Sequence, residues 1–261
     1  MRFFACLTAI ATFFIAGPPS AAAETASLDA LVAAYPEQLA AHDGATLIWR
    51  DGTRMPISDG VEGKSFDELL DEADIDDMFS IPYRPGPATG EPGLNDDPGR
   101  IRNTQFFAKM YGDCRRGEVQ SRMQPVRWVD GSTLRVTSVN GVADRLRRVA
   151  DELAKLPAKF RRFLAPSGGT YNCRTIAGTG RLSMHAFAAA IDISTATTDY
   201  WLWNKPVEGR YPYRNKVPFE IVDIFERHGF IWGGKWYHYD TMHFEYRPEL
   251  FLAAGSRPTG F

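Results

Sequence analysis

Two histidines and one aspartate have the side chains and the sequence context of metal ligands. His185 precedes Asp192, which lies inside an apolar run at residues 188–193. An ionised carboxylate in such a run is costly unless a cation or strong hydrogen-bond donors meet it. His243 lies near the C-terminus between two apolar residues. Two imidazoles and one carboxylate are a suitable set of three ligands for a catalytic zinc ion that keeps water in its fourth position. We therefore predict one zinc ion per chain, held by His185, Asp192 and His243.

Short strands are the elements that should carry these side chains. The run at residues 188–193 predicts a buried strand in which Asp192 faces away from the isoleucines beside it. Across residues 242–246, apolar residues alternate with His243 and Glu245, which predicts a second strand with one polar face. Because Glu245 shares this face with His243, it either orients that histidine or forms an ordinary ion pair on the strand.

Four motifs extend this pattern in a fixed order, at residues 183–185, 190–192, 228–234 and 240–245. On these motifs, residues 168–250 resemble the D-alanyl-D-alanine carboxypeptidase family. This is the VanY-like and L-alanyl-D-glutamate endopeptidase group of the LAS-type zinc metallopeptidases. The resemblance implies a LAS or hedgehog-like fold and a peptidoglycan stem peptide as substrate. Carboxypeptidase removal of a terminal D-alanine and endopeptidase cleavage within the stem both remain open.

The resemblance also implies roles for individual residues. It assigns the zinc to the three ligands named above and makes Asp240 the general base. Arg174 corresponds to the arginine that binds or polarises the substrate carbonyl, with Arg181 as a competing candidate. Ala188 departs from the family pattern, which commonly has glycine at this position. If the backbone there needs a positive φ or a close approach to the metal, alanine is strained.

These residue types suit the hydrolysis of an amide by metal-activated water. Zinc lowers the pKa of bound water to about 7, and Asp240 can accept the proton and pass it to the leaving amine. The metal and Arg174 can stabilise the developing oxyanion. Asp240 and His243 cannot share one face of a regular strand at their odd spacing, so we predict a turn or bulge between them.

Four further residues are candidates for contact with the substrate or with the outer side of the ligands. They are Ser183, Arg181, His238 and Glu245. Ser183 belongs to the first motif, and His238 lies shortly before Asp240. An exposed position without a role is the alternative for His238, because contacts of this kind cannot be identified from spacing.

Two other functions are compatible with the sequence. In one, Cys173 is a nucleophile with His185 or His243 as its base, and thiol alkylation, not chelation, would abolish activity. In the other, the protein is a catalytically weak or inactive module that binds the cell wall and retains the zinc site. Asp240→Ala separates an enzyme, which would lose turnover and keep its metal, from such a module.

Composition and the N-terminal residues bear on compartment and partners. The 261-residue chain has a net charge of −2 with acids and bases intermixed, which gives no support for nucleic-acid binding. Residues 1–23 combine a basic start, a short apolar run and three alanines, and predict a signal peptide cleaved before Glu24. We therefore expect a secreted or periplasmic protein without a membrane span after cleavage.

Cleavage would leave Cys114 and Cys173 as the cysteines of the mature chain. In an exported protein such a pair is compatible with one disulfide. Two free, buried thiols are the alternative.

Three regions are expected to follow the signal peptide. Residues 24–81 predict an N-terminal extension, with a helix over 26–39 and a hairpin that turns at Asp51-Gly52. Residues 82–100 are rich in proline and glycine and form a linker or a surface strap. Residues 101–261 form the zinc peptidase domain.

The expected fold of this domain is α+β. We predict a small antiparallel sheet that bears the zinc ligands, with two amphipathic helices packed on one face. The first spans residues 142–156 and begins with Asn140 as its cap, and the second begins at Pro218. A second hairpin is expected over residues 125–136. The aromatic insertion at residues 195–216 either walls the substrate cleft or covers the core.

Overall fold

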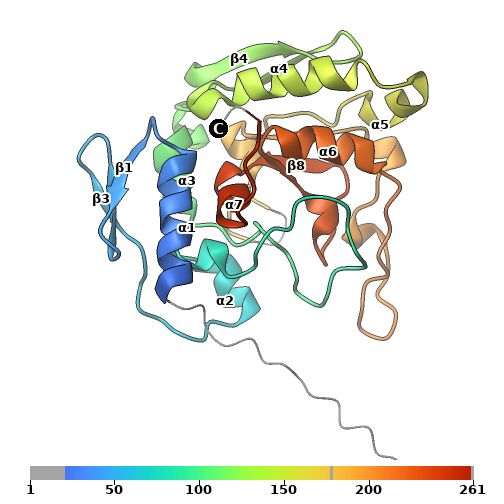
Figure 1. The fold of residues 1–261 in the computed structure, drawn as a ribbon. Helices are drawn as coiled ribbons and strands as arrows, with labels where there is room; N and C mark the ends of the chain where they lie inside the picture. The colour runs from blue at the N-terminus through green and yellow to red at the C-terminus, as the bar shows by residue number, and fades with distance from the viewer. Residues whose placement is uncertain (1–20, 177–178, 260–261) are drawn as a thin grey trace, which may run out of the picture.

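The computed structural model describes residues 21–176 and 179–259 (Figure 1). Its helices are α1 (Ala21–Ala34), α2 (Phe66–Asp71), α3 (Thr104–Tyr111), α4 (Val142–Leu153), α5 (Arg161–Leu164), α6 (Phe219–Arg227) and α7 (Pro248–Ala253). Its strands are β1 (Leu39–His42), β2 (Thr46–Trp49), β3 (Arg54–Pro56), β4 (Met123–Arg127), β5 (Thr133–Thr137), β6 (Ala190–Asp192), β7 (Phe230–Trp232) and β8 (His243–Tyr246). This mixture of helices and small antiparallel sheets confirms the predicted α+β class. The LAS-type arrangement stays a prediction.

Most of the predicted signal peptide, residues 1–20, lies outside the described residues, and Ala21–Ala34 form α1. Across the two described ranges, no helix combines the length and the apolar character needed to cross a membrane.

The sheet that positions the candidate site has three antiparallel strands in the order β6-β8-β7. Its register sets Asp192 directly opposite His243. Opposite residues of an antiparallel pair project from the same face, so strand pairing alone brings these two side chains together. Ile191 lies opposite Phe244 on the other face, and both are fully buried.

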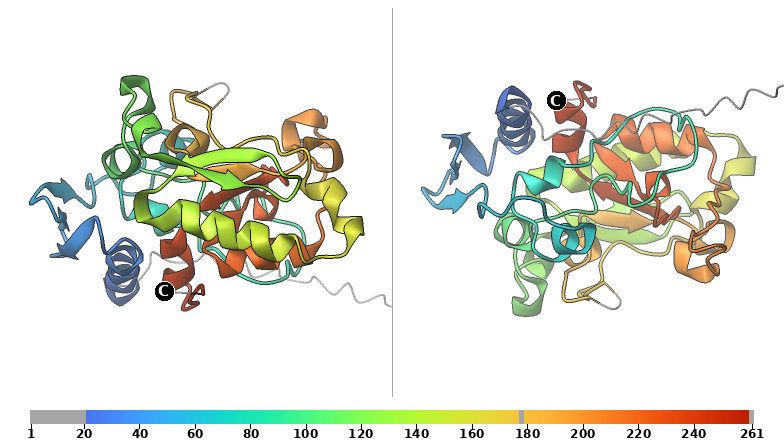
Figure 2. Two further views of the ribbon diagram at one scale, coloured as in Figure 1. Left: turned by 90° about the horizontal axis from the view of Figure 1, so that it is seen from above. Right: turned by 90° about the horizontal axis from the view of Figure 1, so that it is seen from below.

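Helix α6 covers the apolar face of this sheet. Phe225 of α6 stacks on Phe244 of β8, with 3.9 Å between the ring centroids. Helix α4 packs on α6 and on the β4–β5 hairpin (Figure 1). The opposite face of β6 and β8 is thereby left to His243 and its neighbours. Figure 2 shows the β1–β3 sheet at one side of the molecule, away from the site-bearing strands.

Several element boundaries differ from those predicted. The helix expected over residues 26–39 ends at Ala34, because residues 39–42 instead pair as β1 with the predicted hairpin. The strand expected over residues 188–193 is limited to β6, because Ala188 has a φ of 53° and ends a 3-10 turn. Asn140 does not cap α4. It has a positive φ itself, and Gly141 is the residue at the cap position.

The segment rich in proline and glycine, residues 82–100, lies against the C-terminal part of the chain and is called the strap below. Tyr83 is buried and its hydroxyl donates to Glu226 of α6 at 2.5 Å. The indole Nε1 of Trp236 donates to the carbonyl oxygen of Pro98 at 2.7 Å. These contacts bring the end of the strap beside residues 236–240. The domain boundaries themselves stay a prediction.

Candidate active site

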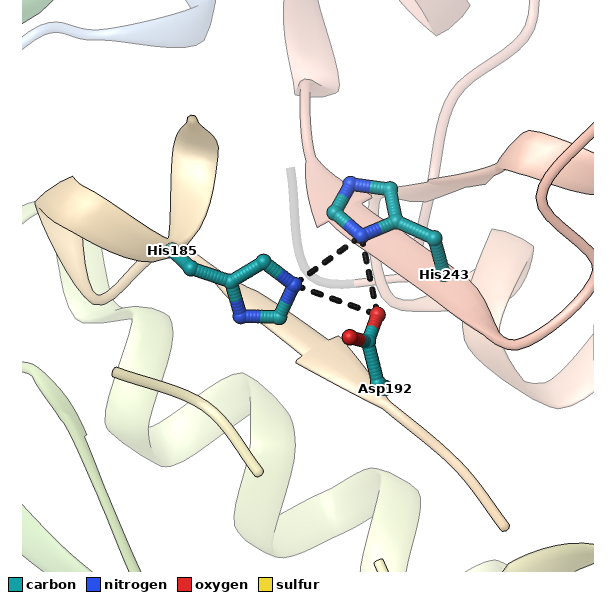
Figure 3. A group of neighbouring side chains, drawn as sticks. All are labelled: His185, Asp192 and His243. Carbon is teal, nitrogen blue, oxygen red and sulfur yellow. Dashed lines mark hydrogen bonds and ion pairs between the residues drawn. The ribbon is translucent and has the colours of Figure 1, made fainter. Parts of the chain in front are cut away.

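His185, Asp192 and His243 converge on one point (Figure 3). His185 Nε2 lies 3.1 Å from Asp192 Oδ1 and 3.1 Å from His243 Nδ1. His243 Nδ1 lies 3.0 Å from the same oxygen of Asp192. His185 comes from the 3-10 turn Met184–Phe187, whereas the other two come from β6 and β8. The structure therefore brings together the three residues that the sequence predicts as ligands.

The outer nitrogen of each histidine, which points away from the common point, faces a hydrogen-bond acceptor. His185 Nδ1 lies 3.2 Å from the carbonyl oxygen of Thr170, and His243 Nε2 lies 3.0 Å from Glu245 Oε2. A carbonyl or a carboxylate can only accept, so each outer nitrogen carries the proton and donates it. Once an inner nitrogen has lost its own proton, its lone pair faces the common point, which is the form of histidine that binds metals.

The spacing of the three inner atoms fits a zinc ion. A tetrahedral ion with bonds of about 2.0–2.1 Å holds its ligand atoms roughly 3.3 Å apart. The observed separations of 3.0–3.1 Å are close to this value. Two imidazole nitrogens and one carboxylate oxygen are also the donor types that zinc accepts in catalytic sites. The residues present therefore suit this ion.

Burial and mutual charge shift the pKa values of the ligands. Burial raises the pKa of Asp192, but His185 and His243 together hold it well below its usual range. Burial lowers the pKa of His243, but hydrogen bonds to Asp192 and Glu245 outweigh this and raise it to about 10. A metal ion must displace the proton on His243, so metal binding weakens as the pH falls.

Asp240 lines the same pocket as the three ligands. Its Oδ1 is buried and has no hydrogen-bond partner among the described residues. Burial and the charge of Asp192 raise the pKa of Asp240 to about 6, against the lowering effect of His243, His185 and Arg100. A carboxylate with a raised pKa and an unpaired oxygen is well suited to accept a proton from water.

The predicted turn between Asp240 and His243 is confirmed. Residues 241–242 form a turn, and the amide of His243 donates to the carbonyl oxygen of Asp240 at 3.1 Å. Both side chains reach the same pocket only because the chain bends here.

The site opens into a pocket of about 320 Å³. Beyond the ligands and Asp240, its lining combines cationic, aromatic, aliphatic and hydroxyl side chains, which are Arg100, Arg102, Arg174, Ile176, Ser183, Met184, Tyr200, Trp201, Trp203, Trp236, His238 and Met242. Arg174 is exposed, and its Nη1 makes a long hydrogen bond of 3.4 Å to the carbonyl oxygen of Thr175. The aromatic residues at 200–203 line the pocket. This favours the interpretation in which the aromatic insertion walls the substrate cleft.

The remaining predicted residues differ in where they lie. Ser183 lines the pocket, and its hydroxyl accepts a hydrogen bond from the amide of His185 at 3.3 Å. His238 also lines the pocket, with its Nδ1 2.6 Å from Asp97 Oδ2. Arg181 is not part of the lining. It pairs with Asp71 of α2 at 3.0 Å instead, which the sequence could not reveal because the two residues are far apart in the chain.

Glu245 connects the metal centre to a buried network of charges. It is fully buried, and two arginines bind it, Arg102 Nη1 at 2.9 Å and Arg247 Nη1 at 3.1 Å. Arg247 also pairs with the buried Glu249, whose Oε2 accepts from the Tyr35 hydroxyl at 2.6 Å. Burial raises the pKa of Glu245, but Arg102, His243 and Arg247 lower it to about 2. The carboxylate is therefore ionised and accepts a hydrogen bond from Nε2 of His243.

A disulfide joins Cys114 and Cys173, with 5.7 Å between the Cα atoms. The predicted bridge is thus present, and Cys173 carries no thiol in this state. The alternative in which Cys173 is a nucleophile is therefore contradicted. The bridge anchors the segment that carries Arg174 to the chain just beyond α3.

The sequence did not indicate the contribution of the strap or of Arg102 just beyond it. Arg100 and Arg102 line the pocket, and Asp97 binds His238. The only signal was a cluster of charged residues at the end of a segment otherwise typical of a linker. Neither periodicity nor a motif relates these residues to the ligands.

Comparison with known families gives one match. Residues 177–246 match the family of D-alanyl-D-alanine carboxypeptidases, peptidases of the M15 type. The matched part contains the three candidate ligands and Asp240. It begins after Arg174 and does not include the strap. No curated protein and no solved structure was found to match the chain.

Proposed function

We propose that this protein is a zinc-dependent peptidase that hydrolyses an amide bond in peptidoglycan stem peptides. The observation that carries the proposal is the convergence of His185 Nε2, Asp192 Oδ1 and His243 Nδ1 within 3.0–3.1 Å of one another beside Asp240. The match of residues 177–246 to the carboxypeptidase family supports the same reaction and the same class of substrate.

The residues of the chain divide the work of hydrolysis. A bound zinc ion supplies Lewis acidity and lowers the pKa of the attacking water. Asp240 takes the proton of that water on its unpaired Oδ1 and later returns it to the leaving amine. Arg174 meets the carbonyl oxygen on which negative charge develops. Glu245 and the carbonyl of Thr170 keep the two histidines in the orientation that metal binding needs.

We further propose that the mature protein is secreted or periplasmic. The composition of residues 1–23 supports this, since it is typical of a cleaved signal peptide. The disulfide is consistent with an oxidising compartment. Peptidoglycan lies in that compartment, so the proposed location and the proposed substrate agree.

A weak or inactive wall-binding module is the second candidate. Ala188 favours it to the extent that a left-handed alanine stands where the family commonly has glycine. Digestion of purified peptidoglycan with the mature protein, with and without a chelator, separates the two. We expect stem-peptide fragments of lower mass that disappear with the chelator and return with zinc. Intact fragments in both arms, with the protein retained on the wall, would favour the binding module.

A further inference from the structure

Arg100 places a largely uncommitted guanidinium group beside the candidate active site. Its Nη1 donates to Asp97 Oδ2 at 2.9 Å, and no other hydrogen bond of its side chain is found among the described residues. Its guanidinium carbon lies 5.6 Å from the ring centroid of Trp236, and that ring lies 5.7 Å from the ring of His243. The side chain is only 13% exposed, and it lines the pocket. The group is therefore fixed in place with most of its donors free.

Asp97 is the anchor that fixes this group. It is fully buried, and its Oδ1 accepts from the amide of His238 at 3.0 Å. Its Oδ2 is shared between Arg100 and Nδ1 of His238. The carboxylate of Asp97 is therefore divided between two side chains and is not bound to Arg100 alone.

Arg102, which lies two residues beyond the strap, differs in this respect. Arg102 is bound to the buried carboxylate of Glu245, through contacts of 2.9 and 3.3 Å. Its charge is therefore matched within the protein. Arg100 is the strap cation whose remaining donors are open to a ligand. A guanidinium with adjacent free donors binds carboxylates in a bidentate manner, and such charge-assisted bonds are strong.

We infer that Arg100 is a substrate-binding residue that recognises a carboxylate of the substrate near the cleaved bond. The inference rests on the proposed function for the identity of the substrate. It adds a specificity determinant that lies on the strap, outside the part of the chain that matches the carboxypeptidase family. Asp97 positions Arg100, and Trp236 supports its face.

Two carboxylates of a stem peptide have the required chemistry. One is the C-terminal carboxylate of the last D-alanine, and the other is the free carboxylate of the D-glutamyl residue. Recognition of the first places a terminal residue in the pocket, as carboxypeptidase action needs. Recognition of the second places the D-glutamyl residue there, as cleavage within the stem needs.

The test measures binding, so it does not depend on turnover. Three synthetic pentapeptides are titrated by calorimetry into the full mature protein after chelator treatment, which prevents the carboxylate from binding a metal. The first has both carboxylates free, the second has a C-terminal amide, and the third has D-isoglutamine in place of D-glutamate. We expect one of the two modified peptides to bind about 10- to 100-fold more weakly than the first, as loss of a charge-assisted contact predicts.

The variants then assign this preference to Arg100. In Arg100→Gln the preference should fall below about 3-fold, and Arg100→Lys should retain part of it, since lysine keeps the charge and loses the fork. Arg84→Gln, which removes an exposed cation of the same strap, should leave the preference unchanged. A ratio of two affinities is independent of the fraction of folded protein. The inference is overturned if the parent protein shows no preference, or if Arg100→Gln keeps it. Failure of the proposed function would instead appear as the absence of chelator-sensitive hydrolysis.

Discussion

Glu245→Gln tests whether the buried carboxylate beside His243 acts on the metal centre as well as on the fold. Glu245 accepts a hydrogen bond from His243 Nε2 at 3.0 Å and pairs with Arg102 and Arg247. The substitution keeps the size of the side chain and removes its charge. A matched control is Glu249→Gln, because Glu249 is equally buried and also pairs with Arg247. Glu249 has no contact with either histidine among the described residues.

The structure sets different magnitudes for the two variants. Both leave a buried arginine short of a carboxylate, and breaking a buried pair lowers the free energy of unfolding by about 3–5 kcal/mol. Only Glu245→Gln also weakens the acceptor that holds His243 in its metal-binding form. Partners of this kind typically contribute 10- to 100-fold in metal affinity. We therefore expect similar losses of stability and a loss of zinc affinity in Glu245→Gln alone.

Two measurements separate these effects. Urea unfolding of the chelated proteins gives the stability, and competition with a chromophoric chelator gives the zinc affinity of the folded fraction at a fixed pH. Equal zinc affinity in Glu245→Gln and Glu249→Gln would refute the reasoning, since the contact to His243 would then have no influence on the metal.

Further predictions concern the proton acceptor, the disulfide and the left-handed alanine. Asp240→Asn should lower kcat about 10²- to 10⁴-fold while zinc affinity stays within about 3-fold, as read by peptide cleavage and chelator competition. In the parent protein kcat/KM should fall as the pH drops below about 6, because the pKa of Asp240 is raised to about 6 and its protonated form cannot accept a proton. A bound cation moves this acidic limb of the pH profile to lower pH. An acidic limb well above pH 6 would exclude Asp240 as the proton acceptor. The stability of the metal-free protein depends on pH in the opposite direction. Because Asp240 binds its proton more tightly in the folded than in the unfolded protein, its protonation stabilises the fold at low pH, and this stabilisation is lost as the pH rises from about 4 to about 6. Replacing Cys114 and Cys173 by serine should lower the free energy of unfolding by about 4 kcal/mol for a separation of 59 residues, measured in urea. Ala188→Gly should change the free energy of unfolding by less than about 1 kcal/mol, because relief of the positive φ is offset by lost packing and by greater entropy of the unfolded chain. Ala188→Val should lower it by about 1–3 kcal/mol. Equal effects of the two substitutions would contradict the strain assigned to Ala188.

The sequence was informative where the site depends on local pattern. The alternation around His243 and the apolar run around Asp192 predicted two strands, and the β6–β8 register sets these residues opposite each other. The odd spacing of Asp240 and His243 predicted the turn between them. Such features depend on the periodicity of one strand, which neighbouring residues encode.

The contacts that the sequence did not reveal join distant segments. Arg181 pairs with Asp71, and Asp97 binds His238, which lies 141 residues further along the chain. No periodicity relates such partners, because tertiary packing alone brings them together. The strap shows the same limit. Its prolines and glycines are typical of a linker, yet its last residue, Arg100, lines the pocket.

The most direct test of the central claim is the anomalous scattering of zinc-soaked crystals, recorded on both sides of the zinc absorption edge. We predict a single strong peak per chain, about 2.0–2.2 Å from His185 Nε2, Asp192 Oδ1 and His243 Nδ1. A peak elsewhere in the molecule, or no peak within bonding distance of these three atoms at saturating zinc, would contradict the account.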